Sequence, residues 1–137
     1  IINHSDGHPY FIFKIGLYGY GVFEMTNKKE FLYIPRGPES FIWTEIDYNP
    51  ANNILIVSGC FWACPYGLNI LDFTNPMAQT KWVDIQNQLD KGYEKYDDIN
   101  FVRWDGNKLI LEAEVIEPRG KEIIEISSEQ YQEWLNK

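Results

Sequence analysis

The feature that most constrains the fold is a nearly unbroken apolar run at residues 54–62. It reads ILIVSGCFW and contains no charged side chain. Turn-forming residues flank it, at 49–53 before the run and at 64–67 after it. A short apolar run bounded by turns is typical of a strand that is covered on both faces. The sequence therefore predicts a central strand with packing partners on its two sides.

Alternating and aromatic segments predict further strands around this run. They lie at residues 10–18, 21–26, 31–34, 41–48, 68–73, 99–104, 109–116 and 121–126. Aromatic residues make up 16% of the chain, and they suit half-buried pleated surfaces. The tripeptide Asp105-Gly106-Asn107 predicts a hairpin. The expected fold class is all-β, with antiparallel blade-like meanders packed as a compact sheet domain.

One short C-terminal helix is expected after the last strand. Ser127 and Gln130 have the spacing of a capping box, which marks a helix start. The apolar residues of this helix would then lie on the sheet. A second helix is left open at residues 80–89, where apolar residues recur at helical spacing over a short stretch.

Two parts of the chain resemble each other in sequence at an offset of 54 residues, as in a weak internal repeat. The segment Asn53-Ile54-Leu55-Ile56 returns as Asn107-Lys108-Leu109-Ile110, and Ile70 and Ile124 share the offset. Over residues 41–126 the pattern resembles the blades of a β-propeller, at the level of architecture. A closed propeller needs at least about four blades, so this chain is too short to close one. The resemblance implies blade-like units that pack on each other, or whose edges another chain covers.

Length and charge limit the organisation and the partners. The chain has 137 residues, which predicts a single domain over 1–137, with residues 1–9 either disordered or foreign to the natural sequence. Its net charge of −8 disfavours nucleic acid and anionic membranes, and no run is long enough to span a membrane. We expect a monomer in the cytoplasm whose partner has a basic surface. Because the chain begins at Ile1 rather than methionine, an upstream segment or signal peptide is left open.

Two histidines and two cysteines are the candidate metal ligands. His4 and His8 form one pair, Cys60 and Cys64 the other, and zinc accepts such a set. However, Cys60 ends an apolar strand, where thiols are usually buried. We therefore expect no metal and no cofactor. The alternative for Cys60 and Cys64 is a disulfide between them. A Cys–His nucleophile is also disfavoured, because the N-terminal stretch would have to fold onto that strand.

The loop after the apolar run is the predicted binding site. Phe61, Trp62 and Tyr66 stand among turn residues, so their rings could be exposed. Exposed aromatic rings anchor protein partners and stack on sugars. The alternative is that these rings cap the core at the end of a sheet.

Paired carboxylates are the remaining candidates. Glu45 and Asp47 are predicted to share one face of the neighbouring strand with Trp43, and Glu112 and Glu114 form a similar pair. Such pairs can raise one pKa or bind a sugar or cation. The alternation also explains them as ordinary solvent-facing residues. We include Trp43, Glu45 and Asp47 in the predicted binding surface.

The leading functional prediction is a non-catalytic binding or interaction domain. Its concrete form is an acidic, inhibitor-like or immunity-like protein that masks a basic partner. The alternatives are a small hydrolase that uses carboxylates at a sheet end, and a structural part of a larger assembly. The sequence contains no phosphate loop, dinucleotide fingerprint or Gly-x-Ser-x-Gly elbow, and no catalytic residue is assigned.

Overall fold

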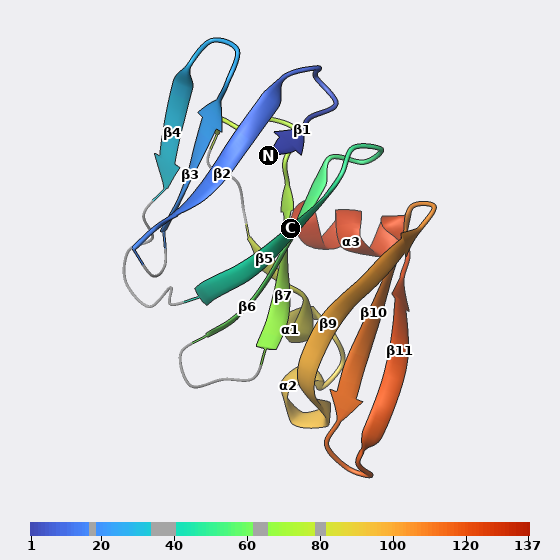
Figure 1. The fold of residues 1–137 in the computed structure, drawn as a ribbon. Coiled ribbons are helices and arrows are strands. Elements are labelled where there is room, and N and C mark those ends of the chain that lie inside the picture. The colour runs from blue at the N-terminus through green and yellow to red at the C-terminus, as the bar shows by residue number, and fades with distance from the viewer. Residues whose placement is uncertain (17–18, 34–40, 62–65, 79–81) are drawn as a thin grey trace.

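The computed structural model describes residues 1–16, 19–33, 41–61, 66–78 and 82–137 (Figure 1). Within these ranges the strands form three antiparallel sheets, which follow one another along the chain. Figure 1 shows sheet B, the second of them, between sheets A and C. The predicted all-β fold with antiparallel meanders is confirmed.

Each sheet contains strands that are consecutive in sequence. Sheet A contains β1 (Ile2–Asn3), β2 (Pro9–Ile15), β3 (Gly19–Glu24) and β4 (Lys29–Tyr33). Sheet B contains β5 (Phe41–Asn49), β6 (Ile54–Phe61), β7 (Tyr66–Asp72) and β8 (Val83–Asp84). Sheet C contains β9 (Tyr96–Asp105), β10 (Lys108–Val115) and β11 (Gly120–Ile126). In all three, hydrogen-bonded neighbours follow chain order.

The described helices are short. They are α1 (Ile85–Gln88), α2 (Gly92–Lys95) and α3 (Ser128–Leu135). The predicted C-terminal helix is confirmed, and Ser127 Oγ accepts a hydrogen bond from the Gln130 N–H at 3.2 Å. Of the segment 80–89, where a helix was the alternative, residues 80 and 81 lie outside the described residues, and the rest forms strand β8 and then the single turn α1. Of the helices in the described ranges, none combines the length and apolarity that a membrane crossing needs.

Strand β6 takes part in two hydrophobic cores. It lies between β5 and β7, so its backbone is paired on both sides. Ile54 and Ile56 pack between sheets B and C, whereas Leu55 and Val57 pack between sheets A and B. All four are at most 3% exposed. The prediction of a central strand covered on both faces is therefore confirmed.

Residues 1–9 hold sheet A against one end of sheet B. The His4 Nε2 donates to the Phe73 carbonyl at 2.7 Å, and its Nδ1 accepts from the Asp6 N–H at 3.1 Å. Because a carbonyl only accepts and an N–H only donates, these contacts assign the donor role to Nε2 and the acceptor role to Nδ1. The ring also stacks on Tyr48, with 5.4 Å between the centroids. The N-terminal segment is thus part of the fold.

A β-bulge interrupts the alternation of β5. Its pairing with β6 shifts between Trp43 and Glu45, which makes Thr44 the extra residue. Gly59 allows the close approach of the two strands, since a Cβ there would lie only 2.2 Å from the Ile42 carbonyl oxygen. An extra residue exchanges the two faces of the strand beyond it.

Strand β11 is the outer strand of sheet C, next to β10. The two-residue loop Gly106-Asn107 makes the residues on either side of it a hydrogen-bonded pair. Along β10 the backbone N–H and C=O groups alternate in direction, so those of the odd-numbered residues point toward β11. Their partners on β11 are even-numbered residues. The N–H and C=O groups of residues 121, 123 and 125 therefore point away from the sheet.

Hydrogen exchange followed by NMR checks this topology. We expect the amides of residues 55–58 to be among the slowest, because they open only with much of the structure. Along β11, the amides of 121, 123 and 125 should exchange faster than those of 122 and 124. Fast exchange throughout 55–58 would contradict the central position of β6.

Candidate functional site

The structure describes only part of the predicted aromatic loop. Trp62 and residues 63–65 lie outside the described residues, and Phe61 is described only as the last residue of β6. Tyr66 begins β7, and its side chain is 50% exposed. Its backbone N–H donates to the Asp98 carboxylate at 2.8 Å. The loop as a partner-binding surface stays a prediction.

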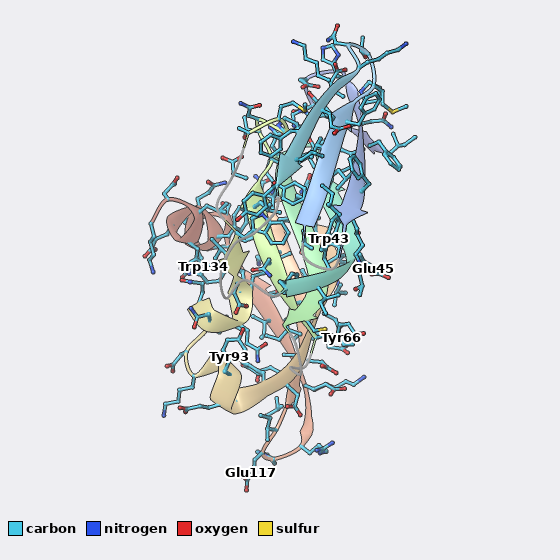
Figure 2. The ribbon with its side chains drawn as sticks, turned by 90° about the vertical axis from the view of Figure 1, so that its left-hand side faces the viewer. Trp43, Glu45, Tyr66, Tyr93, Glu117 and Trp134 are labelled. Atoms are coloured by element: carbon cyan, nitrogen blue, oxygen red, sulfur yellow. The ribbon has the colours of Figure 1, made fainter. Side chains whose placement is uncertain are left out.

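Trp43 does not share a face with Glu45 and Asp47, so that prediction is wrong. The Trp43 ring is buried in the core between sheets A and B, and its Nε1 donates to the Gly19 carbonyl at 3.4 Å. Glu45 is exposed on the opposite face of β5 (Figure 2). The reason is the extra residue Thr44, because strict alternation places residues 43, 45 and 47 together.

Glu45 and Asp47 form an acidic pair on the outer strand of sheet B. Burial raises the pKa of the Asp47 carboxyl, and repulsion from Glu45 raises it further. A carboxyl group with a raised pKa beside a second carboxylate is one arrangement that acid–base catalysts use. In the described structure the pair supplies negative charge on the surface of sheet B.

The candidate metal ligands His4 and Cys60 lie far apart. His4 contacts Tyr48 and Phe73, beside the start of β6, whereas Cys60 lies near its end. Strand rise separates the two ends by about 20 Å. These two residues therefore assemble neither a zinc site nor a Cys–His pair, and Cys64 lies outside the described residues. Within the described ranges, no group of three or more His, Cys, Asp and Glu residues is placed to hold a metal ion.

Two adjoining cavities follow β11 and form what we call the β11 groove. The larger, of about 570 Å³, lies between residues 89–91 and 94–96 on one side and 122–125 on the other. The smaller, of about 360 Å³, continues it toward α3, where Gln130 and Trp134 line it. Leu89, Asp90, Ile124 and Glu125 line both cavities. The groove thus separates the α1–α2 segment from the outer strand of sheet C.

Within the described part of the chain, sheet B contains a fourth strand that sheet C does not, and the β11 groove lies at the corresponding position. Strands β10 and β11 begin 54 residues after β6 and β7, respectively. In sheet B the outer edge of β7 pairs with β8. In sheet C the chain after β11 forms α3 instead, which buries Tyr131 and Trp134 in the core. Among the described residues no strand pairs with the outer edge of β11, and Ile123 on this edge is 58% exposed.

The groove is acidic around an apolar floor. Leu89 and Ile124 form the floor of the groove, and both pack against the hydrophobic core. Its charged lining residues are four carboxylates and two ammonium groups, a net charge of −2: Asp90, Glu94, Glu122, Glu125, Lys91 and Lys95. Lys95 and Glu122 form an ion pair at 3.5 Å, which links α2 to β11 across the groove.

A buried amide shapes the α1–α2 wall of the groove. The Gln86 Nε2 donates to the carbonyls of Gly92 and Tyr96 at 3.2 and 3.0 Å. Gly92 packs so tightly that a Cβ there would lie 1.9 Å from the Gln86 carbonyl oxygen. Asp84 caps α1 and accepts a hydrogen bond from the Tyr93 hydroxyl. Burial raises the pKa of the Asp84 carboxyl, although these hydrogen bonds oppose the shift.

Sequence reasoning did not identify this groove. It interpreted residues 80–89 as an ambiguous helix and residues 121–126 as one of the predicted strands. Figure 2 shows Tyr93, in the α1–α2 segment, on the opposite side of the view from Glu45 and Tyr66 of the predicted surface. The available signal was the capping box at Ser127, because it predicts a helix after residues 121–126 instead of a further strand.

We expect Gln86→Met to lower the free energy of unfolding by about 1–3 kcal/mol, because it leaves buried carbonyl groups without a donor. Urea denaturation measures this change. Gln88→Met is the matched control, since Gln88 lies in the same helix and is only partly buried. Equal, small effects of the two substitutions would show that Gln86 does not stabilise the α1–α2 segment.

Comparison with known proteins gives one partial similarity. No family model matches the chain, and no solved structure matches it. A curated protein described as uncharacterized protein R762 of Acanthamoeba polyphaga mimivirus is 37% identical over 60 residues. The match covers 44% of this chain and 21% of the viral protein, so it spans about a fifth of that relative. The chain is thus similar to part of a viral protein whose description names no activity.

Proposed function

We propose that this chain is a non-catalytic interaction domain, which binds a partner by adding a strand of that partner to the edge of β11. The observation that supports the proposal is the open edge of β11, lying in a groove where sheet C lacks a fourth strand. Main-chain hydrogen bonds supply affinity in this mode of binding, and the side-chain pockets supply specificity.

The chemistry of the edge fits such a role. The N–H and C=O groups of residues 121, 123 and 125 point outward and are available to a new strand. Natural edges are commonly protected by charge, and Lys121 and Glu125 have that effect here. Between them, however, Ile123 is apolar and 58% exposed. A bound strand would cover it.

The acidity of the chain supports a concrete version of this function. A net charge of −8 attracts a basic partner and accelerates the encounter. We retain an inhibitor-like or immunity-like protein that masks a basic surface as this version. The chain would act as a monomer in the cytoplasm, where the free thiol of Cys60 stays reduced.

A hydrolase is the second candidate function. The observation in its favour is the raised pKa of Asp47 beside Glu45. Because these carboxylates lie on β5, away from the β11 groove, the two functions have separate surfaces. Substitution of Asp47 by Asn would abolish hydrolysis and leave binding at β11 unchanged.

A displayed library of random peptides provides the test of strand addition. We expect the selected peptides to shift the NMR signals of residues 121–125 rather than those of residues 45–47 and 66. Ile123→Pro removes an outward N–H at an edge, where proline is tolerated, and should weaken binding about tenfold or more.

Ile123→Val is the matched control, because it keeps the N–H, the β-branched shape and the apolar surface. Thermal unfolding of both variants shows whether they remain folded. Full binding by a folded Ile123→Pro variant would exclude strand addition. Shifts confined to residues 45–47 and 66 would instead place binding at the surface predicted from the sequence.

A further inference from the structure

We infer that the segment bound in the β11 groove is a basic, extended peptide in which lysine or arginine alternates with β-branched apolar residues. This inference rests on the proposed function and specifies the partner of that site. It depends on three properties of the groove: its two-faced edge, its charge and its exposed isoleucine.

The two faces of β11 present different neighbours to an added strand. Ile124 pairs with Leu111 and packs against the core, and Glu122 pairs with Ala113 on the same inner face. Ile123 lies on the outer face, opposite Glu112. Side chains of an added strand alternate in the same way. Every second side chain would therefore enter the groove, and the others would lie beside Ile123.

The inner positions suit lysine or arginine. Their side chains would cross a floor that contains Leu89 and Ile124, and would end near the carboxylates of Asp90 and Glu94. Long basic side chains bury their aliphatic stems in this way while their charge stays in water. The lysines of the wall leave the lining with a net charge of −2, so an acidic peptide would be repelled.

The outer positions suit valine or isoleucine. Ile123 has one cross-strand neighbour, Glu112, and is 58% exposed. Apolar β-branched residues placed beside it on an added strand would remove this surface from water. Basic inner positions and apolar outer positions together give the alternating pattern.

A second copy of this chain fits the edge less well than a peptide does. Each copy has a net charge of −8, so the two molecules repel each other. Two-fold pairing of β11 strands would also keep both inner faces on one side of the joined sheet. Both α1–α2 segments would then lie on that side, where each groove needs space for the added strand.

Three synthetic seven-residue peptides, equal in length to β11, test the pattern. One alternates lysine and valine, one alternates glutamate and valine, and one has the first composition in two blocks. We expect the alternating basic peptide to bind about tenfold more tightly than either control in fluorescence anisotropy. Its affinity should fall as salt is raised.

A double variant, Asp90→Asn with Glu94→Gln, should weaken binding of the basic peptide several-fold. Glu129→Gln with Glu133→Gln is the matched control, since these carboxylates lie on α3 and outside the groove lining. The control should bind as the natural chain does. Equal losses in both double variants would show that only the overall charge matters.

The outcomes separate this inference from the proposed function. Binding of the acidic or the block peptide as tightly as the basic one would overturn the inference, while strand addition would stand. The inference would also be overturned, and strand addition would stand, if all three synthetic peptides failed to bind while library peptides bound at β11. Failure of every peptide would overturn the proposed function itself. Dimerisation in sedimentation experiments that Ile123→Pro abolishes would identify a second copy as the occupant.

Discussion

The burial of sheet B on both faces is the constraint on which the rest of this structure depends. Ile54 and Ile56 of β6 meet sheet C, whereas Leu55 and Val57 meet sheet A. Ile56 and Val57 are adjacent in sequence and belong to different cores, yet each is at most 1% exposed. Because one strand supplies both cores, neither outer sheet can shift without disturbing the packing of the other.

The packing of sheet B against sheet C also fixes the position of the β11 groove. Strand β8 pairs with β7 and leads directly into α1, so the groove wall begins on sheet B. The opposite side, β11, belongs to sheet C and reaches sheet B through the shared core, to which Ile126 contributes. Gln86 ties the wall together, and the Lys95–Glu122 ion pair spans the gap. The groove is therefore a gap between two supported elements.

Local signals made several elements predictable from the sequence. The apolar run at 54–62, the Gly106 hairpin and the Ser127 cap each depend on neighbouring residues, and all three correspond to observed elements. The bulge at Thr44 was not predictable, because it depends on the fit of Gly59 on another strand. Alternation alone therefore placed Trp43 on the wrong face.

The β11 groove was hidden from the sequence for a related reason. Its two sides, which include Leu89 and Ile124, come from segments that no local pattern connects. Helices α1 and α2 have four residues each, too few for a helical period to be recognised. The open edge of β11 is defined by a strand that its sheet lacks, and a residue pattern does not report a missing partner.

The pairing of strands in chain order has a consequence for synthesis on the ribosome. Every ladder in the described residues joins consecutive strands, so each sheet can form as soon as its own segment has emerged. The core between sheets A and B is complete once Trp82 has emerged, whereas the other face of sheet B stays uncovered until β9 to α3 follow. During that interval Ile54, Ile56 and Ile70 face water on the nascent chain. A ribosome stalled after β8 should therefore present a chaperone with a folded unit that has one bare apolar face, detectable by crosslinking at these three positions.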